Sequence, residues 1–310
     1  MSKTILVTGA TDGIGLQTAL DLAKLGHHVL VHGRDMKKLA AATSAVSEVG
    51  RATPLAGDLS SLASVRELAA AVAHLAPRLD VLLCNAGVFE TKHRATADGL
   101  EATFAINHVA HFLLAHLLLP SLEAAGTARA RSRVVVVSSV AHGNGRPARG
   151  KAWSEHFGPK DFEGYGAYAL SKLANVLFVV EMAKRAGDRP VTFNALHPGV
   201  VSTKLLREGF GGMRGPDSLS EGAATSVFLA TSPDVEGASG GYYARAQGGA
   251  VRRGARSRAR ARPLRGERAA LRDRAALSRR RPRGACARGA GAEAVNRVQR
   301  ISGCRSTRRR

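Results

Sequence analysis

The stretch TGATDGIG, residues 8–15, decides the fold. It carries glycines at positions 9, 13 and 15, follows the β-branched run TILVT, and leads into a segment rich in alanine and leucine. Glycine lets the backbone turn tightly and approach a pyrophosphate, which then lies against the free N–H groups and positive dipole of a helix start. The spacing G-x-x-x-G-x-G differs from the dinucleotide fingerprint G-x-G-x-x-G, and such a turn can also serve packing alone. Its place in the first strand-to-helix turn favours a dinucleotide site.

Short apolar runs alternate with longer amphipathic stretches along the chain. The predicted strands are 4–8, 27–32, 80–85, 133–139 and 191–196. The predicted helices are 14–25, 61–76, 100–125, 166–186 and 219–230. This alternation predicts the α/β class, with a doubly wound parallel sheet between two layers of helices. The strands are almost continuously apolar, as expected of strands that are buried on both faces.

Charge divides the 310 residues into two parts. Residues 1–243 carry 24 Lys and Arg against 21 Asp and Glu, whereas residues 244–310 carry 22 against 3, with no lysine and no aromatic residue. We therefore predict one domain over 1–243 and a disordered arginine-rich tail over 244–310, because like charges with little apolar surface do not form a core. Two interpretations of the tail stay open. It binds nucleic acid or another anionic surface, or it is the product of a frame error in a GC-rich gene, which the absence of lysine favours.

The sequence predicts a soluble, cytoplasmic protein. The most apolar run, AINHVAHFLLAHLLLP at 105–120, is interrupted by three histidines and does not reach the roughly 18 residues of a membrane span. The amino terminus has no long apolar region of a signal peptide. Cys84 is the one cysteine of residues 1–243, so no disulfide framework is predicted there. His108, His111 and His116 are not joined by a carboxylate or cysteine at ligand spacing, so no metal is predicted.

The end of the second predicted strand, VHGRD at 31–35, bears on the choice of cofactor. A fold that selects NAD places a carboxylate on the ribose 2′-hydroxyl about 20 residues after the glycine turn. Here Gly33 stands at that position and Arg34 follows, which suits a 2′-phosphate and favours NADP over NAD. Asp35 argues the other way, and a solvated surface arginine is the alternative.

Two tyrosines precede a lysine in GYGAYALSK, residues 164–172. A phenol with its usual pKa of about 10 is a poor proton relay at neutral pH, and a nearby ammonium lowers that pKa. On a helix, the ammonium must lie three or four residues away to share the face of the phenol. Tyr168 and Lys172 meet this condition, whereas Tyr165 lies roughly 10 Å from Lys172 along the axis. The spacing selects Tyr168 as the acid and leaves Tyr165 at the helix start or in the pocket wall.

The chain resembles the short-chain dehydrogenase/reductase family over residues 4–243. The resemblance rests on motifs that arrive in the family's order: TGATDGIG, GDL at 57–59, NAG at 85–87, NHVAHF at 107–112, VVVVSSVAH at 134–142, YALSK at 168–172 and HPGVVST at 197–203. Their wording is most similar to the subgroup of retinol dehydrogenases, WW-domain oxidoreductases and protochlorophyllide reductases, which implies NADP. The implied fold is the Rossmann arrangement. The implied activity is hydride transfer between NADP(H) and a small carbonyl or alcohol substrate.

The resemblance also implies a catalytic tetrad of Asn107, Ser139, Tyr168 and Lys172. Tyr168 would exchange a proton with the substrate oxygen, Ser139 would hydrogen-bond that oxygen, and Lys172 would lower the pKa of the tyrosine and bind the nicotinamide ribose. Asn107 would hold a water of the proton path. Ser138, the neighbour of Ser139, is expected to stay with the backbone.

The residues expected to bind the cofactor are Gly9, Thr11, Asp12, Gly13, Ile14, Gly15, Arg34, Asp58, Leu59, Asn85, Ala86, Gly87, Tyr168, Lys172, Val201 and Thr203. The glycine- and arginine-rich stretch 142–166 is expected to be a long loop at the substrate entrance. Two other functions stay open: a dinucleotide-binding sensor without turnover, against which the Tyr168 and Lys172 pair argues, and nucleic-acid binding through the tail. The sequence also leaves a homo-oligomer open and does not name the substrate.

Overall fold

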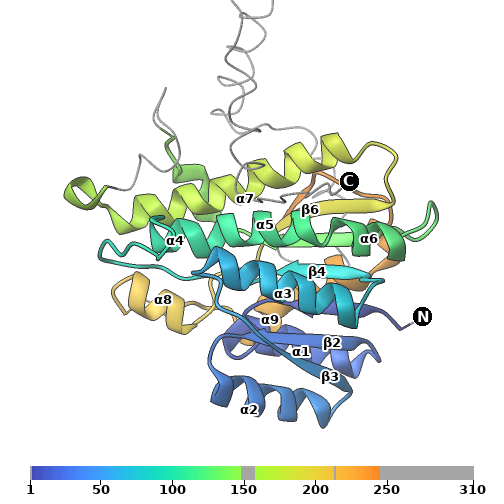
Figure 1. Ribbon diagram of the computed structural model, residues 1–310. Helices are drawn as coiled ribbons and strands as arrows, with labels where there is room; N and C mark the ends of the chain where they lie inside the picture. Colours follow the sequence, from blue (N-terminus) through green and yellow to red (C-terminus); the bar gives the residue numbers. More distant parts are fainter. Residues whose placement is uncertain (1, 148–157, 213, 245–310) are drawn as a thin grey trace, which may run out of the picture. The chain divides into compact units, whose positions relative to one another are not determined.

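One parallel sheet organises the part of the chain that the computed structural model describes, residues 2–147, 158–212 and 214–244. Its strand order is β3-β2-β1-β4-β5-β6-β7 (Figure 1). The strands are β1 (Thr4–Val7), β2 (His28–Gly33), β3 (Arg51–Ala56), β4 (Val81–Cys84), β5 (Ser132–Val137), β6 (Val191–His197) and β7 (Tyr242–Ala244). Every neighbouring pair is parallel. The order reverses between β1 and β4, and this is the doubly wound arrangement that the sequence predicted.

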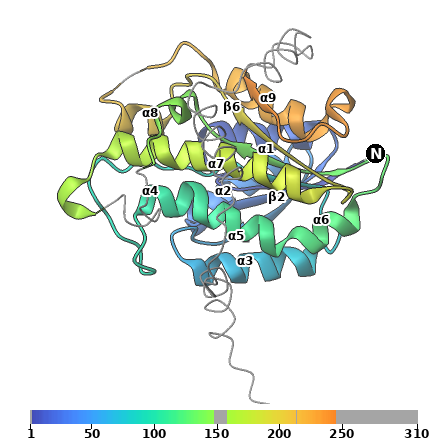
Figure 2. The same ribbon diagram turned by 90° about the horizontal axis from the view of Figure 1, so that it is seen from above.

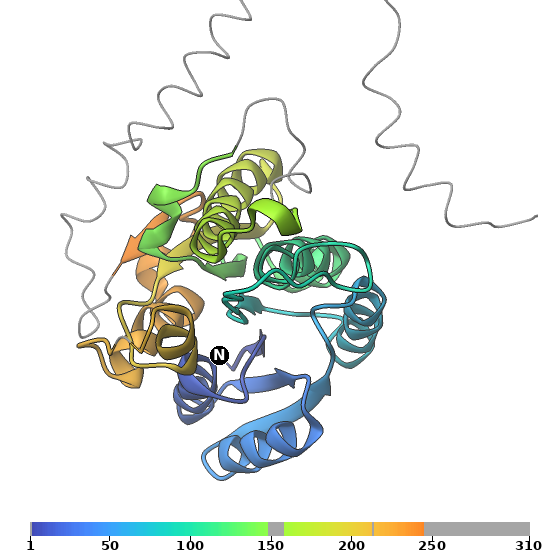
Figure 3. The same cartoon turned by 90° about the vertical axis from the view of Figure 1, so that its left-hand side faces the viewer.

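Helices cover both faces of the sheet. The helices that pack against one face are α1 (Gly13–Lys24), α2 (Met36–Ser47) and α9 (Leu219–Thr231). Those on the other face are α3 (Leu62–Leu75), α5 (Ala110–Leu117), α6 (Leu119–Ala125) and α7 (Gly164–Ala186). Figure 2 shows α3, α5 and α7 side by side, and Figure 3 shows the two helical layers end-on. The short helices α4 (Ala102–Phe104) and α8 (Lys204–Gly209) flank the carboxyl ends of the strands.

The sequence missed the strand β3 and the helix α2. β3 reads RATPLA, is exposed or half-buried at all but Leu55, and contains Pro54, which is tolerated because β3 is an edge strand. α2 buries only three of its twelve residues and therefore shows a weak apolar pattern. The predicted helix 100–125 is three α-helices around a π-helical turn, Ala105–Val109, with a break before Leu119. In β3 and α2 the local apolar pattern is too weak to reveal the element, whereas in 100–125 the apolar pattern does not reveal where the helix is interrupted.

The predicted loop 142–166 is shorter than expected at both ends. Residues up to Asn144 belong to the 3₁₀-helix η2 (Val140–Asn144), and a second 3₁₀-helix, η4 (Pro159–Asp161), follows later. The Glu163 side chain then accepts hydrogen bonds from the N–H groups of Tyr165 and Gly166, and α7 begins at Gly164. This cap starts the helix two residues earlier than the apolar pattern indicated. Residues 148–157 lie outside the described residues.

Within the described part of the chain, α7 is long and apolar enough to cross a membrane by length and composition. The prediction that the chain does not span a membrane stays a prediction. The apolar window of α7 is 61% buried inside the structure, which is also what the core helix of a globular domain shows. A cytoplasmic location stays a prediction. The arginine-rich tail lies outside the described residues except for Ala244, so its two interpretations also stay predictions.

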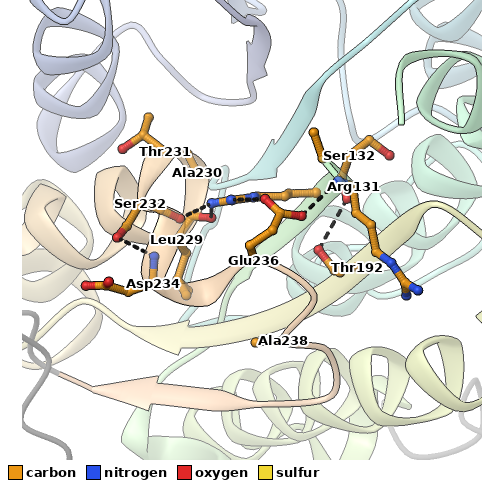
Figure 4. A network of polar contacts seen from close by, with 12 residues as sticks. Arg131, Ser132, Thr192, Leu229, Ala230, Thr231, Ser232, Asp234, Glu236 and Ala238 are labelled. Carbon is orange, nitrogen blue, oxygen red and sulfur yellow. Dashed lines mark hydrogen bonds and ion pairs between the residues drawn. The ribbon is translucent and has the colours of Figure 1, made fainter. Parts of the chain in front are cut away.

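A buried guanidinium ties the end of α9 to the sheet (Figure 4). Arg133 on β5 donates to the carbonyl oxygens of Leu229 at 3.1 Å and Ser232 at 2.9 Å, and pairs with the Glu236 carboxylate at 2.8 Å. The last carbonyls of a helix have no hydrogen-bond donor within the helix and carry partial negative charge. A cationic side chain there donates the missing hydrogen bonds and offsets that charge. Lys3 adds a hydrogen bond of 3.4 Å to the carbonyl of Ala230.

Arg133→Met is expected to lower the free energy of unfolding by about 2–4 kcal/mol, because it leaves the helix carbonyls without a donor and Glu236 without its cation. Arg185→Met is the matched control. It removes an ion pair with Glu181 whose side chains are 71% and 50% exposed, and should cost less than about 1 kcal/mol. Urea unfolding of the two variants measures the difference, and equal losses would contradict this role of Arg133.

Candidate active site

A cleft of about 950 Å³ opens at the carboxyl ends of the strands, where the strand order reverses. In a parallel sheet this edge is where ligands bind. Every residue that the sequence predicted for cofactor binding lines the cleft. Ser139, Tyr168 and Lys172 line it too, whereas Asn107 lies behind its wall. The structure therefore brings together residues from the loops after six different strands.

The glycine turn forms a cradle that a side chain would fill. Gly9 and Gly13 have φ angles of 63° and 55°, in the left-handed region that favours glycine. A Cβ atom on Gly9 would lie 2.8 Å from the Cα atom of Ala86, and one on Gly15 would lie 2.1 Å from the carbonyl oxygen of Gly9. The turn leads into α1 at Gly13, whose N–H donates to the Asp12 carboxylate at 2.7 Å, and the first residues of the helix line the cleft. This geometry fits a pyrophosphate.

The turn is joined to the loop after β4 by hydrogen bonds. Asn85 donates through its Nδ2 atom to the carbonyl oxygens of Thr8 at 2.9 Å and Gly9 at 3.2 Å. The Thr8 hydroxyl accepts from the N–H groups of Asn85 at 2.9 Å and Ala86 at 3.1 Å, and lies 2.9 Å from His111 Nε2. The sequence singled out Asn85 but not Thr8, which looked like the last residue of a strand.

The side chains after β2 set the charge at the adenosine end of the cleft. Arg34 is exposed and lines the cleft, as does Lys38 on α2. The Asp35 carboxylate accepts from the N–H groups of Lys37 at 2.9 Å and Lys38 at 3.0 Å, so it caps α2. Asp35 therefore has a structural task at the start of α2, although it also lines the cleft. Lys38 was not singled out in the sequence because helix α2 was not recognised.

Asp58 follows β3 and is held as a carboxylate. Burial by itself would raise its pKa, but hydrogen bonds from Ser60 and the positive charges of Arg34 and Arg94 outweigh burial and lower the pKa. The N–H of Ser60 donates to Asp58 Oδ1 at 2.9 Å. An ionised Asp58 at this edge can accept hydrogen bonds from an adenine amino group or a ribose.

Tyr168 and Lys172 lie on one face of α7. Both are buried, and Lys172 Nζ lies 5.6 Å from the centre of the Tyr168 ring. Lys172 donates to the carbonyl oxygen of Val137 at 3.1 Å, and Ser139 hydrogen-bonds Tyr168. The Ser138 hydroxyl donates to the carbonyl oxygen of Lys172 at 2.8 Å, so the prediction that Ser138 stays with the backbone is confirmed. The helical spacing of the phenol and amine is therefore realised.

Asn107 lies in the π-helical turn Ala105–Val109. Its Oδ1 atom accepts from the N–H of Val88 at 2.8 Å, and its Nδ2 atom donates to the carbonyl oxygen of Val88 at 2.9 Å and to Ser171 Oγ at 3.0 Å. The Oδ1 atom and one amide hydrogen thus fix the loop at Val88, and the other amide hydrogen joins the π-helical turn to α7 at Ser171. The expected role of Asn107 in holding a water stays a prediction. π-helical turns are rare and often accompany functional sites.

An aromatic wall stands beside the Tyr168 hydroxyl. Phe89 stacks on the Tyr168 ring at 5.2 Å, and Phe210 meets it edge-on at 5.9 Å. Tyr165 meets Phe210 at 5.9 Å and accepts a hydrogen bond of 2.7 Å from Asn144. This places Tyr165 at the helix start and in the pocket wall, as predicted. Phe89 and Phe210 come from loops far apart in the sequence and carry no motif, so sequence reasoning missed them.

Comparison with known proteins agrees with this geometry. A family model described as short chain dehydrogenase matches residues 3–151. Retinol dehydrogenase 14 of Homo sapiens is 38% identical over 271 residues, which covers 78% of this chain and 77% of that protein. Polyprenol dehydrogenase of Mus musculus is 40% identical over 254 residues, which covers 77% of this chain and 75% of that protein. The chain belongs to the short-chain dehydrogenase/reductase family.

Solved structures extend the agreement to the fold of this short-chain dehydrogenase/reductase. The Pseudomonas aeruginosa RhlG/NADP active-site complex superposes with a TM-score of 0.64 at 26% identity, covering 78% of this chain and 94% of that chain. A short chain dehydrogenase from Shigella flexneri complexed with NADP superposes with a TM-score of 0.62 at 25% identity, covering 78% and 96%. The protein is an oxidoreductase of the retinol dehydrogenase subgroup. A nicotinamide dinucleotide is its cofactor, and the cradle at Gly9 and Gly15 fits the pyrophosphate of that group.

Burial dominates the titration of Tyr168 and Lys172. It raises the pKa of Tyr168 to about 12, although the hydrogen bond with Ser139 acts to lower it. Burial also lowers the pKa of Lys172 to about 8. The expectation that the ammonium brings the pKa of the tyrosine below 10 is therefore wrong for the protein as described. The hydration that a buried phenolate loses outweighs the hydrogen bond from Ser139.

The three histidines of the apolar run 105–120 and Cys84 make contacts that fit a structural role. His108 bonds to Asn175 Oδ1 at 3.0 Å, and His116 stacks on Phe112 with ring centres 6.2 Å apart. His111 Nδ1 lies 3.1 Å from the carbonyl oxygen of Asn107, and burial lowers its pKa to about 3, so the ring is neutral. Cys84 is 1% exposed on β4, and burial raises the pKa of its thiol, as expected of a small buried hydrophobe.

Lys172→Met is expected to stabilise the fold at pH 7 by about 1–3 kcal/mol, because it removes a buried ammonium. The folded pKa of about 8 lies below the unfolded value of 10.5. The wild type therefore binds fewer protons when folded across this window and gains stability as the pH rises. The advantage of the variant should shrink between pH 8 and pH 10.

Urea unfolding of the cofactor-free protein at each pH measures this trend. Lys184→Met, on the exposed side of the same helix, is the control and should change stability by less than about 0.5 kcal/mol. A Lys172→Met protein less stable than the wild type at pH 7 would contradict the assigned cost of the buried ammonium.

Proposed function

We propose that this protein interconverts an alcohol and a carbonyl compound with NADP(H), and that Tyr168 exchanges the proton. The observation that carries the proposal is the placement of a buried phenol, a buried ammonium and a serine hydroxyl on one wall of a cleft whose opposite end is a glycine cradle. Proton exchange with a reacting oxygen needs an acid at a fixed position, and hydride transfer needs a bound nicotinamide beside it.

In the direction of reduction, the Tyr168 hydroxyl donates its proton to the carbonyl oxygen. A pKa of about 12 keeps the phenol protonated at neutral pH, so the donating form is the resting form. Ser139 hydrogen-bonds the same oxygen and fixes its distance from the phenol. A nicotinamide dinucleotide bound in the cleft would supply the hydride. Lys172, held by the carbonyl of Val137, would donate to the nicotinamide ribose and would stabilise the phenolate that forms when the proton leaves.

The aromatic wall supports an apolar substrate. Phe89, Phe210 and the body of Tyr165 border the space next to the Tyr168 hydroxyl, together with Leu205. An apolar pocket with a few polar groups at its end binds the apolar part of a ligand and orients its one polar group. Relatives named retinol dehydrogenase and polyprenol dehydrogenase act, by their names, on apolar alcohols. We therefore propose a long-chain or ring-containing apolar alcohol, or its carbonyl, as the substrate class.

Arg34 and Lys38 support NADP over NAD. Both are cations that line the cleft at its adenosine end, where a 2′-phosphate would lie. Asp35 also lines the cleft, but its Oδ1 atom caps α2 by accepting hydrogen bonds from the N–H groups of Lys37 and Lys38. Solved relatives in complex with NADP agree with this preference.

Tyr168→Phe should reduce NADPH-linked turnover by about 100-fold or more, because it removes the proton donor. The dissociation constant for NADPH should stay within about twofold of the wild type, since the ring and its packing remain. Tyr165→Phe is the comparison, and it should alter KM for the substrate with a change in kcat of less than about threefold. Turnover and NADPH fluorescence titrations measure these quantities. Undiminished turnover by Tyr168→Phe would rule out Tyr168 as the acid.

Arg34→Ala and Lys38→Ala should each weaken NADPH binding about tenfold and leave NADH binding unchanged, because each removes a charge-assisted contact to the 2′-phosphate. Lys37→Ala is the matched control, since Lys37 is equally exposed but does not line the cleft. Fluorescence titration with both reduced cofactors provides the readout. The NADP preference is refuted if the two variants lose affinity for NADH and NADPH in equal measure.

A further inference from the structure

His32 lies near the carboxyl end of β2, two residues before Arg34, and is 2% exposed. Its imidazole stands between the glycine turn after β1 and the loop after β3. The N–H of Gly9 donates to His32 Nδ1 at 3.2 Å, and His32 Nε2 lies 3.1 Å from the carbonyl oxygen of Gly57. One side chain thus contacts the backbone of two cofactor-binding loops that come from different strands.

The two contacts fix the protonation state of the ring. A backbone N–H can only donate, so Nδ1 must carry no proton, and Nε2 must carry the proton that it donates to the carbonyl of Gly57. A charged imidazolium would place a second hydrogen on Nδ1, facing the N–H of Gly9. Burial lowers the pKa of His32 to about 4, which agrees with a neutral ring at physiological pH. Both nitrogens of the ring are therefore satisfied by backbone groups.

Backbone bonds around His32 hold the same three segments. Ala10 donates to the carbonyl oxygen of His32 at 2.9 Å, and Gly57 donates to the carbonyl oxygen of Gly33 at 3.2 Å. A Cβ atom on Gly57 would lie 3.2 Å from His32 Nε2, closer than nearly all Cβ contacts, so glycine there allows the loop to approach the ring. The loop that is fixed this way continues directly into Asp58.

We propose that His32 is a positioning residue that sets the distance between the pyrophosphate-binding turn at Gly9 and the adenosine-binding loop at Asp58. The inference rests on the proposed binding of NADP(H) in this cleft. The turn and the loop belong to separate strands, and each would otherwise adjust when the adenosine half of the cofactor binds. A ring that already joins them reduces the conformational freedom that binding must remove.

His28 on the same strand provides the matched comparison. Its Nε2 atom lies 2.9 Å from Thr53 Oγ1, so it also joins β2 to β3 by one side-chain hydrogen bond. It lies at the opposite end of β2 and does not line the cleft. Loss of a β2-to-β3 hydrogen bond can therefore be separated from loss of the bridge between the two cofactor loops.

The test is isothermal titration calorimetry of the full chain with NADP⁺ and with adenosine 2′,5′-bisphosphate. His32→Leu should raise both dissociation constants about tenfold, since the half-buried N–H of Gly9 and carbonyl of Gly57 lose their partner. kcat at saturating NADPH should stay within about twofold. His32→Asn can still accept from Gly9, and His32→Gln can still donate to Gly57, so each should fall between the wild type and His32→Leu. His28→Leu should bind both ligands as the wild type does.

The inference is overturned if His32→Leu binds both ligands within about twofold of the wild type. It is also overturned if His28→Leu weakens binding to the same extent, because the effect would then be general destabilisation. Should His32→Leu fail to fold, His32→Asn and His32→Gln carry the test, and wild-type affinity in both overturns the inference. A wild-type protein that binds neither ligand refutes instead the proposed function.

Discussion

The structure depends on the close approach of two backbones at the point where the strand order reverses. A Cβ atom on Gly9 would lie 2.8 Å from the Cα atom of Ala86, so the two backbones are too close for a side chain between them. Asn85 and Thr8 then tie the two loops together. This contact shapes the cradle that fits a pyrophosphate.

The face of α7 that carries Tyr168 and Lys172 is organised at a cost in stability. Burial disfavours the ammonium of Lys172 and the phenolate of Tyr168, and both pKa values move accordingly. A protein selected for stability alone would place apolar side chains there. The polar groups are retained on a helix that is otherwise packed against the sheet, and the Val137 carbonyl and Ser139 satisfy them. Such local conflicts between packing and charge are typical of active sites.

The sequence predicted what is local and missed what tertiary packing creates. The glycine turn and the spacing of Tyr168 and Lys172 are each contained within nine residues, so the pattern alone revealed them. The edge strand β3, which contains Pro54, shows no alternation of apolar and polar residues. Helix α2, which carries Lys38, buries only three residues, so its helical apolar periodicity is too weak to recognise. Phe89 and Phe210 meet over Tyr168 only after folding. The direction of the tyrosine pKa was wrong for the same reason, because helical spacing says nothing about burial.

The central claim is that the nicotinamide end of the cofactor lies beside Tyr168 and Lys172, with the pyrophosphate on the glycine turn. A crystal structure of the full chain grown with NADP⁺ tests it most directly. We expect a nicotinamide ribose hydroxyl within hydrogen-bond distance of Lys172 Nζ and phosphate oxygens against the N–H groups at the start of α1. A dinucleotide bound with its phosphates away from this turn, or its nicotinamide away from the Tyr168 hydroxyl, would contradict the account.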